Sequence, residues 1–405
     1  MGESGAPNGG GPLSGIRVLD LTAVVLGPFA TQTLGDWGAE VIKVEPPAGD
    51  LVRASGVRKH RGMASVFLGV NRNKRSLCLD LKTPEGAEVL RRLVPRVDAL
   101  VTNVRPAGMA RLGFGWEHCA ALNPRLVYAV ATGFGQDGPH RARPAFDEVI
   151  QAASGLAAVV GGEEGPPAFV PSLVADKITG MALLSAVLAA LLHRERTGEG
   201  QLVEVPMLET LAAFVAVEHL GGATFEPPAG PPGYERLRHR KPVATSDGWI
   251  TLLPYTAAHW RAFFTAAGRP ELVETLGTDD ATTRNANIGA VYAAVADLAR
   301  SRPTAEWLAL CERLDIPATA FSTLEGLPAH PHLAAVGMFP VSEHPTEGGL
   351  RQARPPTRFA ATPASVRRHA PRLGEHTAEV LSELGYDESA IRGMAERRAV
   401  VLGDG

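Results

Sequence analysis

The sequence predicts an α/β fold, in which a parallel sheet carries helices on both faces. Short β-rich segments alternate with helical segments from Gly15 to about Ala131, and this alternation is typical of consecutive βαβ units. The chain has 405 residues, which is longer than one ordinary domain, so we expect at least two domains. Hydrophobic residues make up 45% of the chain and charged residues 20%, a composition that can bury a sizeable core.

Turn and capping residues mark where the elements of the first half begin. Gly27 and Pro28 suit the start of a helix, because proline has a helical φ and lacks only an N–H that the first turn leaves unpaired. Thr83 and Pro84 supply an N-cap and a first helical position in the same way. The expected elements, in order, are a strand at 15–22, a helix at 27–34, strands at 39–44 and 75–81, a helix from 84, and strands at 98–102 and 125–131.

The second half begins with a long apolar helix that starts near Asp176 and ends in basic residues at 193–196. Its uncharged part, 178–192, is shorter than the ~20 residues that cross a bilayer, so we expect a buried core helix. Eight of the thirteen residues at 221–233 are Gly or Pro, which predicts a stiff linker at a domain boundary. The elements expected beyond it are a strand at 248–253 and helices at 257–267, 290–300 and 304–314 of a smaller α+β domain, an extended segment at 328–371 and a helix at 376–384.

Charge and cysteine content argue against several classes of protein. The 40 Lys+Arg and 43 Asp+Glu give a net charge of −3, so there is no overall field to hold nucleic acid. Cys78, Cys119 and Cys311 are far apart and are expected to be buried thiols, not metal ligands or a disulfide framework. Residues 1–12 are glycine-rich and lack a secretory signal, so we expect a disordered tail on a cytoplasmic protein.

Three features could carry chemistry. Gly133, Gly135 and Gly138 match G-x-G-x-x-G after a strand, but Pro139 follows where a pyrophosphate-binding helix should begin, so we interpret these glycines as loop-shaping. Asp176 lies at the expected N-cap of the apolar helix, where it either only caps the helix or is a carboxylate nucleophile held ionised at pH 7. A basic group could bind a phosphorylated ligand or be solvated surface: Arg53, Arg72, Lys74, Arg75, Lys82, Arg105 and Arg111.

Seven blocks in order give the chain a family resemblance. They are GIRVLDLT (15–22), LGDWGAEVIKVEPPAGD (34–50), NRNKRSLCLDLK (71–82), NVRPAGMARLGF (103–114), NPRLVYAVATGFGQDGP (123–139), ADKITGMALLSAVLAALLHRERTGEGQ (175–201) and GEHTAEVLSELGY (374–386). With these blocks the chain resembles the family III CoA-transferases, the CaiB/BaiF group. The resemblance implies a large Rossmann-like domain made from both chain ends, a small domain between them, and a homodimer of two interlocked subunits. The large domain would take 13–220 and 328–405, the linker 221–233 and the small domain 234–327.

The resemblance also implies a reaction and a site. Asp176 matches the family's catalytic aspartate, which attacks an acyl-CoA thioester so that CoA passes to a free carboxylic acid through covalent aspartyl intermediates. Acyl-CoA and the acid are then substrates, and no metal, tightly bound cofactor or membrane is expected. Coenzyme A should contact Leu79, Lys82, Asn103, Arg105 and Arg111, with the cations near its phosphates.

Departures from the family pattern bear on the substrate. Phe146, before Asp147, stands where the racemases of the group have a histidine base, which disfavours racemisation. The formyl-CoA:oxalate enzymes have a glutamine where this chain has Val25 and a CoA-contacting arginine where it has Pro46. Their glycine-rich covering loop is also not visible at 233–249, so oxalate is disfavoured.

A basic run at 236–241 follows the expected linker. It is either a solvated loop or, through Arg238 and Arg240, a contact for the second carboxylate of a dicarboxylic substrate. Two alternatives to a CoA-transferase stay open. One is a 2-methylacyl-CoA racemase or epimerase, and the other is a CoA-ester-binding protein in which Asp176 only caps its helix.

Overall fold

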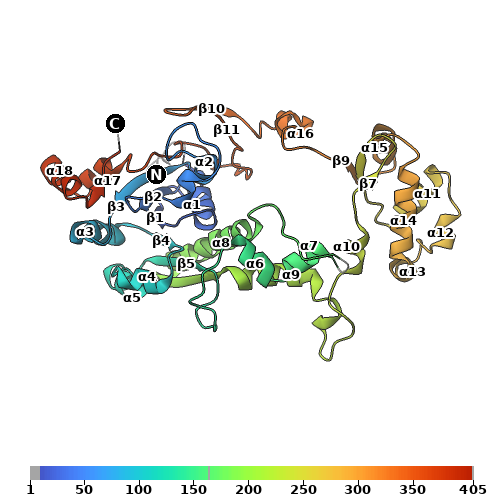
Figure 1. Ribbon diagram of the computed structural model, residues 1–405, viewed down its shortest axis with the longest axis horizontal. Coiled ribbons are helices and arrows are strands. Elements are labelled where there is room, and N and C mark those ends of the chain that lie inside the picture. The colour runs from blue at the N-terminus through green and yellow to red at the C-terminus, as the bar shows by residue number, and fades with distance from the viewer. Residues whose placement is uncertain (1–9, 163–164, 404–405) are drawn as a thin grey trace, which may run out of the picture. The chain divides into compact units, whose positions relative to one another are not determined.

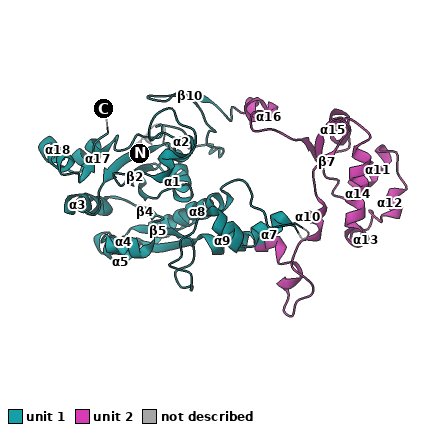
Figure 2. Cartoon of the chain, viewed as in Figure 1, with its two compact units in different colours: residues 1–215, 337–405 teal, residues 216–336 magenta. Residues whose placement is uncertain are grey.

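The computed structural model describes residues 10–162 and 165–403 (Figure 1). Most of the expected tail, residues 1–9, lies outside this part of the chain. The chain divides into two compact units. Unit 1 comprises Met1–Val215 and Gly337–Gly405, and unit 2 comprises Ala216–Val336 (Figure 2). The segment expected as a linker, 221–233, lies within unit 2, and its only helix or strand is the short 3-10 helix η3 (Gly221–Thr224).

Unit 1 is built on a seven-stranded sheet with the order β12-β3-β2-β1-β4-β5-β6. Six strands are parallel, which confirms the predicted sheet, and β12 pairs antiparallel with β3. Sequence patterns missed β6, whose apolar residues alternate too weakly, and β12, which is two residues long. The strands are β1 (Arg17–Leu21), β2 (Glu40–Glu45), β3 (Lys74–Leu79), β4 (Ala99–Thr102), β5 (Val127–Thr132), β6 (Gln201–Pro206) and β12 (Val400–Val401).

Alternate side chains of the strands pack into separate cores on the two faces of the sheet. In β1, Leu19 and Leu21 belong to one core and Val18 to the other. Each fully buried leucine stabilises the fold by about 1.5–3 kcal/mol. The first core is covered by α3 (Pro84–Leu93), α4 (Pro106–Arg111), α5 (Trp116–Leu122), α17 (Thr377–Glu383) and α18 (Glu388–Glu396), and the second by α1 (Leu26–Asp36), α6 (Asp147–Ala153), α7 (Leu156–Gly161), α8 (Val174–Thr197) and α9 (Met207–His219).

The long helix α8 is the apolar helix that the sequence predicts. Its last turn contains Arg194, and Gly198 follows with a left-handed φ of 82°, so the predicted end is confirmed. Only one face is buried, because Met181 and Leu192 are 60% and 52% exposed. Among the described helices it alone is long and apolar enough to cross a membrane, and half of its most apolar stretch is buried inside the protein.

Unit 2 combines a small antiparallel sheet with helices, and its core contains the aromatic residues Trp260, Phe263 and Trp307. The three predicted helices are all present, within two residues of their expected ends. The elements are α10 (Glu235–His239), β7 (Val243–Ala244), β8 (Trp249–Leu252), α11 (Ala257–Ala266), α12 (Leu272–Thr275), α13 (Ala281–Ala286), α14 (Ile288–Ala299), α15 (Thr304–Arg313), β9 (Ala318–Ala320), η4 (Leu327–Ala329) and α16 (Pro331–Ala335).

The return segment into unit 1 is more structured than the extended chain expected at 328–371. β10 (Val341–His344) and β11 (Gly348–Arg351) form an antiparallel hairpin. The turn depends on Gly348, whose φ of 71° suits a residue without a Cβ. Three further short elements complete unit 1: η1 (Leu51–Ala54), α2 (Ser65–Val70) and η2 (Val94–Arg96).

Candidate active site

The strand order places a topological switch point between β1 and β4. The chain passes from β1 to β2 and β3 on one side, then crosses to β4 and β5 on the other. In open α/β sheets, ligands bind beyond the carboxyl ends of the strands at such a point. Here the β1–α1 loop is tied to the end of β4, because the Asn103 side chain accepts from Ala23 N (2.9 Å) and donates to Ala23 O (2.8 Å).

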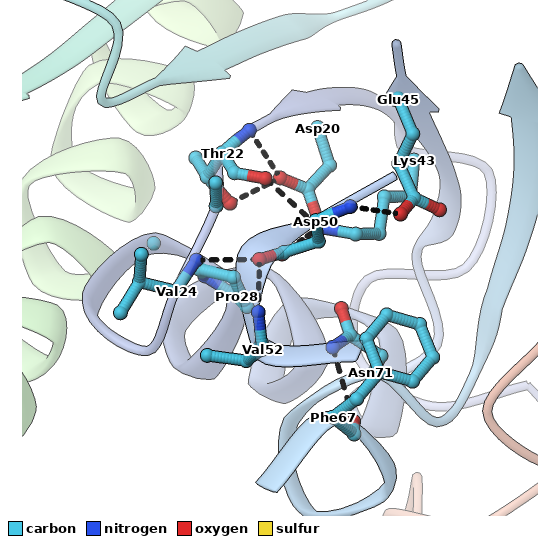
Figure 3. Close-up of polar contacts among 12 residues, drawn as sticks. Asp20, Thr22, Val24, Pro28, Lys43, Glu45, Asp50, Val52, Phe67 and Asn71 are labelled. Atoms are coloured by element: carbon cyan, nitrogen blue, oxygen red, sulfur yellow. Dashed lines mark hydrogen bonds and ion pairs between the residues drawn. The ribbon is translucent and has the colours of Figure 1, made fainter. Parts of the chain in front are cut away.

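A buried charged network that includes Asp20, Lys43 and Asp50 packs beside the β1–α1 loop (Figure 3). Lys43 Nζ lies 3.0 Å from Asp50 Oδ2, and Lys74 Nζ lies 2.9 Å from Asp20 Oδ2. Although burial opposes it, the neighbouring Lys74 and Lys43 lower the pKa of Asp20 to about 2. Burial lowers the pKa of Lys74 to about 8, against the attraction of Asp20. This network was not predicted from the sequence, although Asp20, Lys43 and Lys74 are charged residues within otherwise apolar strands.

The network holds one strained residue of the loop. Val24 has a φ of 70°, a left-handed conformation that costs a residue with a Cβ about 1–2 kcal/mol. Its N–H donates to Asp50 Oδ1 (3.0 Å), which also accepts from Val52 N (3.1 Å) (Figure 3). Asp50, which is paired with Lys43, therefore fixes the path by which the chain enters α1.

Asp176 was predicted to be the N-cap of α8, but it occupies the third position of the helix. The observed N-cap is Leu173. The Asp176 carboxylate makes no hydrogen bond among the described residues, so the prediction of a capping side chain is wrong. The residue is only 7% exposed. Its backbone N–H donates to Asp147 Oδ2 (2.9 Å). The helix begins earlier than the charge pattern indicated, and Asp147 takes the capping role.

Asp176 is also not held ionised as the sequence analysis expected. Burial, followed by repulsion from Asp147 and Glu148, raises the pKa of its carboxyl to about 7. The helix dipole favours the anion, but desolvation outweighs it. Near neutral pH this carboxylate is therefore poorly solvated and poised between its two protonation states, which suits a nucleophile.

The packing of α8 turns Asp176 toward the β1–α1 loop. Gly180 lies one turn further along α8, and a Cβ there would be 2.7 Å from Leu26 O at the start of α1. Residues four apart share a helix face, so Asp176 faces the chain that precedes Leu26. The unpartnered carboxylate thus lies at the switch point, beside the residues that Asp50 holds in place.

The predicted substrate-pocket residues divide between the two units. In unit 1, Asp147 is 2% exposed and accepts from Gln151 Nε2 (2.5 Å), Val25 is buried, and Phe146 is 59% exposed. In unit 2, Arg238 and Arg240 are near α10. Arg238 pairs with Glu235 (3.1 Å), while Arg240 Nε donates to Tyr292 Oη (3.1 Å) and its guanidinium lies over the Tyr255 ring.

The predicted CoA contacts follow β3 and β4 at the carboxyl edge of the sheet. Lys82, Arg105 and Arg111 are exposed, and Arg105 donates to Ala142 O (3.2 Å). Leu79 is 1% exposed and pairs with Val400 of β12, so the structure does not present it on the surface. Asn103 already binds Ala23.

Other predicted features have clear outcomes within the described residues. No helix begins between Gly133 and Asp147, as expected for a loop and not for a dinucleotide site. The three cysteines are free and buried, which confirms that prediction. No group of three or more His, Cys, Asp or Glu side chains that could hold a metal is present in 10–162 or 165–403.

Comparison with known proteins gives the class. The model of CoA-transferase family III matches residues 13–377. The chain is 33% identical to the succinyl-CoA–L-malate CoA-transferase beta subunit of Chloroflexus aurantiacus, covering 96% of this chain and 98% of that one. It is 34% identical to the formyl-CoA:oxalate CoA-transferase of Shigella sonnei, covering 96% and 99%. The chain therefore belongs to CoA-transferase family III.

The fold agrees with this membership. A crystal structure of a hypothetical protein from Mycobacterium tuberculosis aligns with a TM-score of 0.80 at 33% identity, covering 92% of this chain and all of that one. The family, the enzyme class and the α/β architecture predicted from the sequence are thus confirmed. The relatives named here are CoA-transferases, which does not favour the racemase alternative.

Proposed function

We propose that the protein moves CoA from an acyl-CoA thioester to a free carboxylic acid, with Asp176 as the nucleophile. The observation that carries the proposal is a buried carboxylate that has no hydrogen-bond partner among the described residues, on the helix α8 that packs against the start of α1. Such a group has little solvation to lose when it attacks a carbonyl carbon. Family membership supports the thioester as the electrophile.

The proposed reaction proceeds by exchange at two carbonyl groups. The Asp176 carboxylate attacks the thioester carbonyl, the C–S bond breaks, and a mixed anhydride and CoA thiolate form. The thiolate then attacks the aspartyl carbonyl, which gives an aspartyl-CoA thioester and the free donor acid. The acceptor carboxylate attacks this thioester, and the released thiolate takes the acceptor acyl group from the second anhydride. One thioester replaces another of similar energy, so no ATP is consumed.

Neighbouring groups position the nucleophile for these steps. Asp147 holds the backbone of Asp176, and its charge disfavours a second anion nearby, so a deprotonated Asp176 is a strong nucleophile. Lys82, Arg105 and Arg111, together with Asn103 at the end of β4 and Leu79 at the end of β3, are the proposed contacts for CoA.

The acceptor or donor is proposed to be a dicarboxylic acid. Succinate, malate and oxalate, three of the four acids in the names of the two relatives, carry two carboxylates, and the fourth, formate, carries one. Arg238 and Arg240 are the proposed contacts for the carboxylate that does not react. If so, Arg238→Gln with Arg240→Gln should raise the KM for a dicarboxylic acceptor and leave that for a monocarboxylic one unchanged. Equal KM values in both proteins would refute this assignment.

We further propose that two copies of the chain form the active enzyme, as interlocked subunits of a homodimer with a Rossmann-like large domain. The exposed apolar residues Met181 and Leu192 on α8 support an additional covering chain. Analytical ultracentrifugation should give twice the mass of the chain at micromolar concentration. A monomer with full transfer activity would contradict this part of the proposal.

The experiment that tests the function incubates pooled acyl-CoA esters with a panel of carboxylic acids and follows new thioesters by mass spectrometry. Asp176→Ala should abolish exchange while keeping the fold, whereas Asp137→Asn, a change at an exposed loop position, should leave it intact. A racemase would instead incorporate solvent deuterium at Cα without any acid. A binding protein would retain CoA without turnover.

A further inference from the structure

A buried glutamine of α6 joins three segments at the start of α8. Gln151 is 1% exposed and lies one helical turn after Asp147, so both side chains share a face of α6. Helix α6 packs against α8, which carries Asp176 (Figure 1). The chain enters α8 through residues 165–173, which contain no helix or strand. Hydrogen bonds of the Gln151 side chain reach this segment and Asp147 at the same time.

The main chain fixes which way the Gln151 carboxamide points. Its Oε1 accepts from Val170 N (2.9 Å), and its Nε2 donates to Val170 O (3.3 Å) and Ser172 O (3.4 Å). Because an N–H can only donate, Val170 N requires the oxygen of the carboxamide on its side. The NH2 group is left to donate to Asp147 Oδ1 (2.5 Å). A hydrogen-bond donor, and not an acceptor, therefore faces the Asp147 carboxylate.

The Asp147 carboxylate depends on this donor. Its Oδ1 accepts from Gln151, and its Oδ2 accepts from the backbone N–H of Asp176 (2.9 Å) in the first turn of α8. Asp147 also lies in the first turn of α6, where the helix dipole favours an anion. It is 2% exposed, and within 10–162 and 165–403 it forms no ion pair. Removal of the Gln151 amide would leave Oδ1 buried without a partner.

Asp147 acts on the nucleophile in two ways. It holds the backbone of Asp176 through the N–H that it accepts. Its charge also acts on the Asp176 carboxyl: after burial, repulsion from Asp147 and Glu148 of α6 raises the pKa of that carboxyl, while Lys177 of α8 lowers it. A change in the position or the charge of Asp147 should therefore change both the placement and the protonation of Asp176.

We propose that Gln151 is a positioning residue for the Asp176 nucleophile, and that it acts through the hydrogen bond its NH2 group donates to Asp147. The inference rests on the proposed function, since it takes Asp176 as the nucleophile. Without this donor the buried Asp147 carboxyl favours its protonated form or moves toward another donor. The first turn of α8 then loses the contact that orients it. A displacement of about 1 Å at a reacting group costs about 10²-fold in rate.

A purely structural role for Gln151 would rest on its other contact. If Gln151 only held the segment 165–173, acceptance from Val170 N would suffice, and a carboxylate accepts that hydrogen bond as an amide does. A glutamate at this position has the same shape but donates to Asp147 only while it is protonated. Two carboxyl groups in contact share one proton, so Gln151→Glu keeps a donor near neutral pH and loses it at higher pH. The pH dependence of this variant separates the two roles.

The test measures kcat and KM for CoA transfer by the full-length protein, relative to the wild type, at about pH 6 and about pH 9. Gln151→Met should lower kcat about 10²-fold at both pH values with little change in KM. Gln151→Glu should stay close to the wild-type kcat at the lower pH and fall toward the methionine variant at the higher. Gln32→Met is the matched control and should keep the wild-type kcat. Gln32 is also buried and pairs with main chain, at Gly69 O (3.1 Å) and Arg72 N (3.0 Å), but in the described part of the chain it has no hydrogen bond to a carboxylate.

A double variant tests the route through Asp147. In the Asp147→Ala background, Gln151→Met should lower kcat little further, because the residue through which it acts is absent. If Gln151→Met does not fold, the comparison of Gln151→Glu at the two pH values still decides. A Gln151→Glu variant whose kcat relative to the wild type is the same at both pH values would overturn the inference while leaving the transferase intact. A wild type that transfers no CoA would instead overturn the proposed function.

Discussion

Replacement of Asp176 by Asn should stabilise the protein while it abolishes transfer. The pKa of this carboxyl is raised from 3.8 to about 7, mainly by burial, so folding favours the protonated form. The stability that protonation provides is fully present below pH ~4, where the unfolded chain is also protonated, and is lost as pH rises through about 7. Above that pH the wild type carries a buried anion, whereas the Asn variant carries a neutral amide of similar shape.

The magnitude follows from the pKa difference. A pKa difference of about 3 units, at ~1.36 kcal/mol per unit, gives an upper value of about 4 kcal/mol for the gain in the free energy of unfolding. Local hydration of the carboxylate reduces this value. We therefore expect the Asn variant to be more stable than the wild type by about 2–4 kcal/mol at pH 8. At pH 5 the gain should be about half as large or less. Urea unfolding of both proteins at the two pH values, followed by circular dichroism, measures it. Asp137→Asn serves as the exposed control. An Asp176→Asn variant that is no more stable than the wild type at pH 8 would refute the reasoning.

Three further predictions follow from the same region. The kcat/KM for acyl-CoA should rise with pH through about 7 and then level off, since the free enzyme must lose the Asp176 proton; a flat profile from pH 5 to 9 would contradict this. Gly180→Ala should destabilise unit 1 by about 1–3 kcal/mol, because the added Cβ would clash with Leu26 O. Gly69→Ala is the control, since no atom lies within 4 Å of its added Cβ, and thermal unfolding should show a lower melting temperature only for Gly180→Ala. Asp50→Asn should destabilise the protein by about 3 kcal/mol, because it removes the carboxylate that pairs with the buried Lys43 and leaves the ammonium group hydrogen-bonded to Thr22 O; a smaller loss in urea unfolding would show that the pair is dispensable.

Sequence patterns predicted those parts of the fold that depend on local periodicity and on end signals. The strands β1 to β5 lie within two residues of their expected positions, because each is a short apolar run bounded by turn residues. The N-cap Thr83 and the left-handed Gly198 were also predictable, since each is specified by its own side chain. The edge strand β12 could not be predicted, because two residues are too few to show an alternation of apolar and polar side chains.

The candidate site was harder to predict, because its properties depend on residues distant in sequence. The sequence pointed to Asp176 as a candidate, but its burial, its raised pKa and its lack of a hydrogen-bond partner within the described part of the chain depend on Asp147 and on the packing of α8. The pairing of Lys74 on β3 with Asp20 on β1 requires both strands to be in register with β2, which lies between them. Glu347 contacts Lys59 and His60, which lie almost 290 residues earlier in the chain. No local sequence pattern could predict this contact.

Transfer of an oxygen atom tests the central claim most directly. With an acceptor acid labelled by ¹⁸O in both carboxylate positions, the second anhydride leaves one labelled oxygen on the nucleophile when CoA departs with the acceptor acyl group. Digestion after one turnover, with fragmentation of the peptide that contains Asp176, should show a mass gain of 2 Da at that residue. An unlabelled Asp176 after complete conversion of the acceptor would show that the acids exchange without an aspartyl anhydride.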